Sequence, residues 1–124
     1  TKEGRRLPDT ELELMTLLWK SGEGQVADVI GALPPGRELA YTSVSTILRI
    51  LEQKGFVEAS KVGRGHVYKP LLSKEEYEAR TLHDVVDRVF DGTPMALARQ
   101  LLQTSTLSQT DLDELKTLIS RLEK

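Results

Sequence analysis

Three stretches in the first half of the chain repeat apolar residues every three or four positions, the spacing of a helix with one buried side. These stretches lie at residues 10–21, 26–33 and 41–54. A Thr10-x-x-Glu13 pattern predicts a capping box at the start of the first helix, and Gly22 predicts its end. Gly55 predicts the end of the third helix. The pattern therefore predicts a small core of three helices.

The periodicity changes after Gly55, where β-branched and aromatic residues become frequent. Residues 56–62 and 66–69 are typical of strands, and Gly63-Arg64-Gly65 between them predicts a tight turn with glycines at positive φ. Tyr68 alternates with a lysine, so we expect Tyr68 to point into the core. Three helices followed by a hairpin are the element order of a winged helix-turn-helix. The predicted fold class is mainly α with a small β-hairpin, followed by a helical region.

Residues 73–124 predict three further helices, opened by capping residues at Ser73 and Ser108 and by Pro94. Because the preceding domain closes a core of its own, their apolar sides either fold back on that domain or pair with a second copy. We favour pairing. The predicted division is a flexible arm (1–8), a winged-helix DNA-binding domain (9–72) and a helical dimerisation domain (73–124). The residues expected in the dimer interface are Leu82, Val86, Val89, Phe90, Leu101, Leu112, Leu115, Ile119 and Leu122.

The third helix carries a polar side opposite its apolar side when it is drawn as a helical wheel. Small hydroxyl residues let a helix approach the major groove closely, and an arginine pairs with guanine through two hydrogen bonds. The alternative is a face that is only solvated, although such faces are usually richer in Glu and Lys. The residues predicted to read bases are Thr42, Ser43, Ser45, Thr46 and Arg49.

The formal net charge of −2 does not by itself favour a nucleic-acid partner, but the charges are unevenly distributed. Residues 41–69 contain five Lys or Arg and two Asp or Glu. Phosphate neutralisation requires a local basic surface rather than a basic average. We therefore predict that Lys61, Arg64, His66 and Lys69 contact phosphate. The alternative is that these charges only keep the turn in water.

The residues that enzymes and metal sites require are scarce. The chain has no cysteine and two histidines, His66 and His83, which lie in different predicted elements. No phosphate-binding glycine loop, hydrolase elbow or zinc-protease helix is present. We predict no catalysis, no metal and no cofactor. No apolar run approaches the about 18 residues of a membrane span, so we expect no membrane partner. The absence of cysteine fits a cytoplasmic protein, which we expect.

A second class of function is a winged-helix module that binds a protein and not DNA. That reading predicts an apolar or acidic outer face on the third helix and no basic hairpin turn. The residues do not fit it: the outer face carries Thr, Ser and Arg, and the turn carries Arg64. An enzyme would need clustered titratable residues, and the chain does not offer them.

Several segments resemble the BlaI/MecI family of penicillinase and methicillin-resistance repressors. Residues 40–57 resemble its recognition-helix block, residues 12–19 its first helix and residues 63–70 its wing, and Leu107-Ser108 with the following helix resembles its C-terminus. The resemblance covers nearly the whole chain. It implies a homodimeric repressor that binds an inverted-repeat operator in double-stranded DNA and controls a resistance or stress-response gene.

The sequence departs from the family pattern at two places. In the β-lactam-responsive members, a membrane sensor and protease pathway leads to cleavage at an Asn-Phe step, and Gln100-Leu101 occupies that place here. The inducing signal therefore stays open. Ile50 stands where members often carry arginine, so a phosphate contact is either lost or taken over by Arg49. The absence of cysteine excludes the cysteine-rich copper motif of related repressors.

Overall fold

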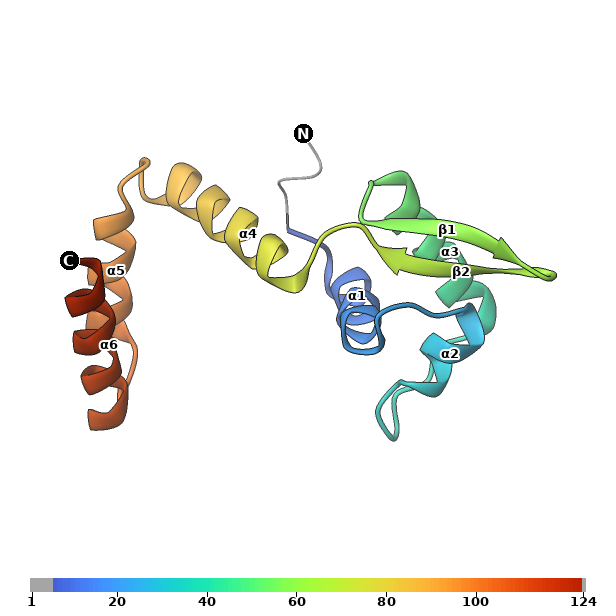
Figure 1. Cartoon of the computed structure of the whole chain (residues 1–124), viewed down its shortest axis with the longest axis horizontal. Helices are drawn as coiled ribbons and strands as arrows, with labels where there is room; N and C mark the ends of the chain where they lie inside the picture. Colours follow the sequence, from blue (N-terminus) through green and yellow to red (C-terminus); the bar gives the residue numbers. More distant parts are fainter. Residues whose placement is uncertain (1–5, 124) are drawn as a thin grey trace. The chain divides into compact units, whose positions relative to one another are not determined.

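The computed structural model describes residues 6–123. In chain order its elements are α1 (Asp9–Ser21), α2 (Val26–Gly31), α3 (Tyr41–Gln53), β1 (Val57–Val62), β2 (Gly65–Pro70), α4 (Lys74–Val89), α5 (Pro94–Thr104) and α6 (Gln109–Leu122) (Figure 1). The predicted fold class is confirmed: the chain is mainly helical, with one antiparallel two-stranded hairpin. Contacts divide the chain into two compact units, unit 1 (Thr1–Asp84) and unit 2 (Val85–Lys124), and α4 supplies residues to both.

The core of unit 1 lies between α1, α3 and the hairpin. The side chains that it excludes almost completely from water are Leu14, Met15, Leu18, Val44, Leu48, Leu51, Phe56 and Val57. Each such side chain stabilises the fold by about 1.5–3 kcal/mol relative to exposure. The helical residues among them recur at intervals of three or four, so the apolar periodicity of the sequence identifies the inner side of each helix.

The start of α1 differs from the prediction. The helix begins at Asp9, and Pro8 precedes it without a side-chain cap, so the expected Thr10–Glu13 capping box is wrong. The Glu13 carboxylate instead binds the Arg37 guanidinium, with N–O distances of 2.9 Å from both Nε and Nη2. A guanidinium that donates two charge-assisted hydrogen bonds is a stronger partner for a carboxylate than one backbone N–H.

The end of α3 positions the hairpin. Gly55 has φ = +86°, and its N–H donates to the Glu52 carbonyl at 3.0 Å. The Phe56 N–H donates to the Leu51 carbonyl at 2.9 Å, which completes a Schellman motif. This sharp reversal buries Phe56 and sends the chain directly into β1. The hairpin consequently runs alongside α3 (Figure 1).

The hairpin has a two-residue turn, because Val62 pairs with Gly65. Gly63 has φ = +61°, as expected, whereas Gly65 is not at positive φ. Positive φ at the first turn residue alone is the requirement of a type II′ turn, which suits the twist of a hairpin. Tyr68 is buried, as expected, and exchanges two backbone hydrogen bonds with Gly24, at 2.8 and 3.0 Å. Gly24 therefore adds a one-residue bridge to the edge of the hairpin.

Unit 1 extends beyond residue 72, where the sequence placed the end of the winged helix. Tyr77 of α4 is buried, with its ring centroid 5.5 Å from that of Trp19 and 6.1 Å from that of Phe56. Its hydroxyl accepts a 2.7 Å hydrogen bond from the N–H of Leu7, which is itself buried. Leu7 was expected in a flexible arm and is instead part of the core. Residues 1–5 of that arm lie outside the described residues.

The capping residues of the second half behave as expected at two helices. Ser73 and Glu76 form a reciprocal box at the start of α4, with bonds of 3.0 and 2.7 Å. Ser108 and Asp111 do the same at α6, with bonds of 3.0 and 3.1 Å. α5 begins at Pro94.

Unit 2 consists of the end of α4, α5 and α6. α4 ends at Val89, before the expected Gly92, and both Asp91 and Gly92 have positive φ. Neither α5 nor α6 buries a residue. Among the described residues of this unit, Val86 is the one buried hydrophobic side chain.

Candidate nucleic-acid interface

α3 has a buried apolar side and an exposed polar side. Val44, Leu48 and Leu51 are fully buried in the core of unit 1. On the outer side the predicted base-reading residues Thr42, Ser43, Thr46 and Arg49 are exposed, and Ser45 is half-buried at the flank. Because the inner side is anchored by close packing, the outer side chains are presented from a rigid helix.

A hollow of about 420 Å³ lies between α3 and the end of the hairpin that carries the turn, and we call it the α3–wing hollow. Ser45 and Arg49 line it from α3, and Arg64 and His66 line it from the hairpin. Residues that the sequence assigned separately to base reading and to phosphate contact therefore meet around one concave surface.

The hairpin register divides the four predicted wing residues. Lys61 pairs directly with His66, on the same face of the hairpin as Ala59 and the buried Tyr68. Lys69 belongs to the opposite face, near the other end of the hairpin from the turn. It lines a different hollow together with Trp19. The structure thus places Arg64 and His66 at the α3–wing hollow, pairs Lys61 with His66, and leaves Lys69 apart from them.

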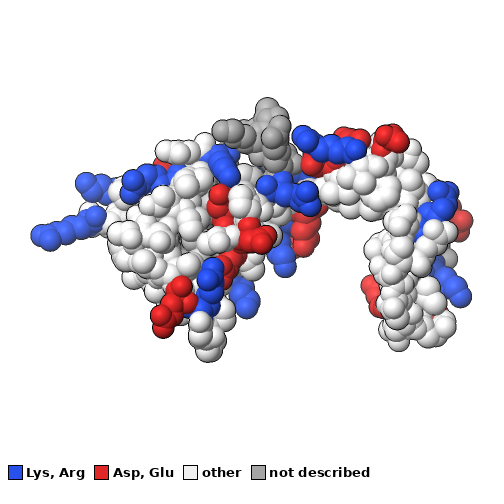
Figure 2. Space-filling model, turned by 180° about the vertical axis from the view of Figure 1, so that it is seen from behind, with Lys and Arg blue, Asp and Glu red and all other residues white. Residues whose placement is uncertain are grey.

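The basic groups near α3 are not neutralised within residues 6–123. Arg49, Lys61 and Arg64 form no ion pair there, whereas Arg37 and Lys54 pair with Glu13 and Glu11 at 2.9 and 2.6 Å. The hydrogen bond from Arg37 holds the pKa of the Glu13 carboxyl below its ordinary value. Figure 2 shows basic side chains projecting at the end of unit 1 that carries the hairpin turn. Unpaired guanidinium groups are suited to phosphate and to guanine.

Two residues that α3 contributes to the α3–wing hollow were not among the predicted site residues. Tyr41, at the start of α3, is 61% exposed, and Glu52 lies about three turns further along. With Ser45 and Arg49 they form one stripe along the helix, so extending the spacing of those two residues would have identified both. Glu52 is an acidic neighbour of Arg49 that disfavours phosphate and is suited to accept a hydrogen bond from a cytosine amino group.

Most of the residues predicted for dimerisation are exposed to solvent in the single chain. Leu82, Val89, Leu101, Leu112, Ile119 and Leu122 are exposed, and Phe90 and Leu115 are half-buried. Val86 differs, because only 7% of it is exposed within the single chain. Gln100 and Leu101, at the place of the Asn-Phe step, are exposed residues inside α5.

Residues 6–123 show neither a candidate metal site nor a membrane-spanning helix. No group of three or more His, Asp or Glu side chains lies close enough together to hold a metal ion. No helix in that range has the length and apolar character to cross a bilayer.

Comparison with known sequences gives consistent results. The family model described as penicillinase repressor matches residues 7–121. The penicillinase repressor of Bacillus licheniformis is 28% identical over 110 residues, which cover 89% of this chain and 86% of that protein. The transcriptional regulator BlaI of Mycobacterium tuberculosis is 36% identical over 88 residues, which cover 70% of this chain and 64% of that protein.

Comparison with solved structures agrees. The DNA-binding domain of the repressor BlaI superposes with a TM-score of 0.51 at 30% identity, over 58% of this chain and 88% of that domain. The protein hsRosR superposes with a TM-score of 0.55 at 20% identity, over 96% of this chain and 91% of that chain, which shows a shared fold alone. The family match over nearly the whole length shows that this chain belongs to the penicillinase repressor (BlaI/MecI) family, whose members are DNA-binding transcriptional repressors and not enzymes.

Proposed function

We propose that this protein is a homodimeric repressor that binds an inverted-repeat operator through α3 and the hairpin. The observation that carries the proposal is the α3–wing hollow, where Arg49, Arg64 and His66 meet beside a row of small polar residues on α3. A helix with this surface fits the major groove, and a hairpin beside it reaches the adjacent backbone.

The outer side of α3 is the base-reading surface in this proposal. Thr42 and Thr46 are short enough to let the helix backbone approach the bases, and their methyl groups suit the methyl group of thymine. Arg49 forms no ion pair within residues 6–123, so its guanidinium is available for guanine, and Ser43 and Ser45 border the surface on its two flanks. We add Tyr41 to this set because it is exposed at the start of α3.

The hairpin turn supplies sequence-independent affinity. Arg64 occupies the turn, and Lys61 and His66 face each other one pair behind it. Contacts of this kind go to phosphate or enter a narrow minor groove, and they weaken as salt rises. We leave Lys69 out of this group, because it lies on the opposite face of the hairpin from Lys61 and His66 and lines a different hollow.

The proposal of a dimer is supported by the solvent-exposed apolar sides of unit 2 and α4. One winged helix contacts few base pairs, whereas two copies on an inverted repeat combine their contacts. A twofold interface buries the same surface on both copies. Leu101, Leu112 and Ile119 are exposed apolar residues that such an interface would cover.

We propose that the protein acts in the cytoplasm and regulates a resistance or stress-response gene. It is supported by relatives named as the penicillinase repressor and the methicillin resistance regulatory protein MecI. Gln100-Leu101 replaces the Asn-Phe step and lies inside α5, so we propose that relief of repression does not use cleavage at such a step. A sensor or protease pathway could still relieve repression, if it acts at another place on the chain.

The test is selection of bound fragments from random DNA by the full-length protein, followed by affinity measurements on the selected operator and on random DNA. Thr46→Ala should weaken operator binding by about 1 kcal/mol while random DNA is bound as before. Ser60→Ala, on the outer face of the hairpin, is the matched control and should change neither affinity.

Two results would contradict the proposal in different ways. Equal losses on operator and random DNA for Thr46→Ala would remove the base-reading role of α3. Failure to enrich any sequence, in a protein that is folded and dimeric, would favour the alternative of a winged-helix module that binds a protein partner.

A further inference from the structure

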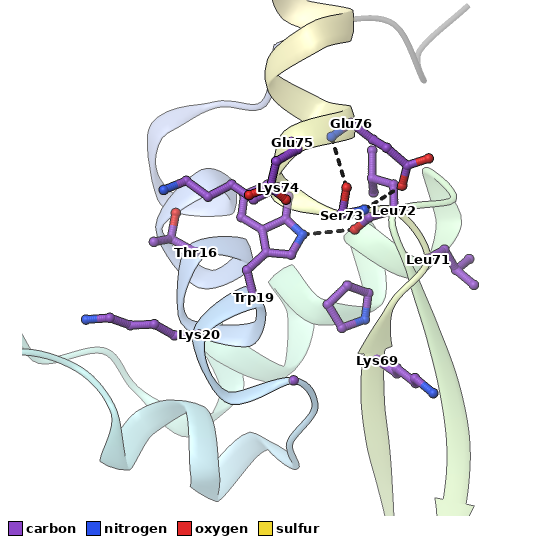
Figure 3. Close-up of a pocket in the computed structure, with 12 residues that line it drawn as sticks. Thr16, Trp19, Lys20, Lys69, Leu71, Leu72, Ser73, Lys74, Glu75 and Glu76 are labelled. Carbon is purple, nitrogen blue, oxygen red and sulfur yellow. Dashed lines mark hydrogen bonds between the residues drawn. The ribbon is translucent and has the colours of Figure 1, made fainter.

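We propose that a second hollow in unit 1 is a binding site for a small aromatic carboxylate. The hollow lies where the end of α1, the end of β2 and the first turn of α4 meet, and we call it the α1–α4 hollow (Figure 3). Its volume is about 570 Å³, within the range of small-molecule sites. It shares no lining residue with the α3–wing hollow, so the inference goes beyond DNA binding.

The apolar part of the α1–α4 hollow is a rigid aromatic surface. The indole N–H of Trp19 donates to the Leu72 carbonyl at 3.0 Å, and its ring packs at 5.5 Å from the ring of Tyr77. The indole is therefore held in place while it lines the hollow (Figure 3), and Pro70 is a further apolar lining residue. Leu71 at the rim is 57% exposed, although it is a large apolar side chain. A flat ring would cover this surface by stacking on the indole.

The charged part of the α1–α4 hollow favours an anion. Lys20, Lys69 and Lys74 line it, and none of the three forms an ion pair within the part of the chain that the structure describes. Two carboxylates oppose them. Of these, Glu76 already accepts the Ser73 N–H at 2.7 Å, and only Glu75 has no such hydrogen bond among the described residues.

At the start of α4 the Glu76 N–H is not available to an anion, because it donates to the Ser73 hydroxyl at 3.0 Å. The excess of one positive charge therefore comes from the lysines. A ligand with one ring and one carboxylate matches both the apolar and the charged parts. It would contact three segments that come together only in the folded chain, and so would stabilise unit 1 by an amount that rises with the logarithm of its concentration relative to its dissociation constant.

The test is a titration of the full-length, DNA-free protein with 2-naphthoate. Trp19 is the one tryptophan of the chain, so its indole N–H has a single cross-peak in a ¹H–¹⁵N spectrum and reports on the hollow itself. We expect a saturable shift of that peak. The uncharged 2-naphthamide should bind at least about tenfold more weakly, and acetate, which lacks the ring, should leave the peak in place.

Variants separate this site from general attraction between lysines and anions. Replacing Lys20, Lys69 and Lys74 together by Gln should lower the affinity for 2-naphthoate at least about tenfold, and all three side chains are exposed, so the fold should persist. Lys61→Gln, at the turn end of the hairpin, is the matched control and should bind as the parent does.

The proposal is overturned if the indole peak does not shift saturably, if the amide binds as well as the acid, or if the triple variant binds as well as the parent. Because DNA is absent from these measurements, none of these results bears on the role of α3.

Discussion

Units 1 and 2 are built from helices of similar apolar periodicity, but they use it differently. In unit 1 the apolar sides of α1 and α3 meet the hairpin and Tyr77, and eight large side chains are almost fully buried. In unit 2 neither α5 nor α6 buries a residue, and Leu101, Ile119 and Leu122 stay exposed. The same sequence pattern thus accompanies a completed interior in one unit and an uncovered surface in the other.

The difference teaches where each unit obtains its stability. A core closed within the chain stabilises unit 1 at any protein concentration. In the homodimer that we propose, the apolar helix sides of unit 2 are covered by a second copy, so their contribution to stability would depend on protein concentration, by mass action. Substitutions in the two units should therefore respond differently to protein concentration.

Leu48→Ala should have the largest effect, because Leu48 is fully buried in unit 1. Truncation leaves a cavity and should lower the free energy of unfolding by about 2–5 kcal/mol. Denaturant titration at two protein concentrations measures it, and the loss should be the same at both. A loss below about 1 kcal/mol would mean that α3 is not anchored as described.

Ile119→Asp tests unit 2 and should weaken the proposed dimer. Ile119 is 54% exposed on α6, and a symmetric interface would bury the new carboxylate once from each copy. The dissociation constant of the dimer should rise at least about a hundredfold, measured by sedimentation equilibrium.

Ser120→Asp places the same charge one residue away, on the other side of α6, and is the matched control. It should leave the dimer intact. Equal behaviour of the two variants would place the interface outside this side of α6.

Arg64→Ala should separate DNA affinity from assembly. The loss of one phosphate contact should weaken binding to operator and to random DNA by about 1 kcal/mol each and reduce the salt slope by about one. The dimer should be unaffected.

Lys69→Ala removes a lysine from the other face of the same hairpin and should leave DNA affinity unchanged. If it weakened binding as much as Arg64→Ala, the assignment of faces to the hairpin would be wrong.

Glu13→Gln should have the smallest effect. The Arg37 hydrogen bond lowers the pKa of Glu13 in the folded protein, so the pair stabilises unit 1 above the ordinary carboxyl pKa of 4.5. This contribution is lost as pH falls through the lower, folded-state pKa. Melting curves of parent and variant should therefore differ slightly at neutral pH and converge in acid. A constant difference across the pH range would argue against the ion pair.

Local patterns in the sequence predicted much of the secondary structure. The periodicity around Val44, Leu48 and Leu51 predicted the buried side of α3, and the Ser73 and Ser108 patterns predicted two helix starts. These signals work because the interacting groups lie within one or two helical turns of each other. The Thr10–Glu13 box failed because the helix begins at Asp9, which places Thr10 inside it, and the Glu13 carboxylate binds a distant residue, Arg37.

The candidate site was predictable in its residue types and less so in its grouping. The polar face of α3 and a basic hairpin follow from the sequence. Strand register, however, decides that Lys61 and His66 share a face while Lys69 does not, and a run of residues does not reveal which pairs are opposite. The contributions of Tyr41 and Glu52 to the α3–wing hollow likewise depend on where the hairpin packs against the helix.

The sequence by itself determined the order of elements, the inner side of each helix and the position of the hairpin turn, because these depend on neighbours along the chain. Only the tertiary structure decided that Leu7 and Tyr77 complete the core of unit 1, that the α3–wing hollow gathers Arg49 and Arg64, and that Trp19 lines a second hollow. Those features join residues up to 70 positions apart, and such contacts depend on how whole elements pack.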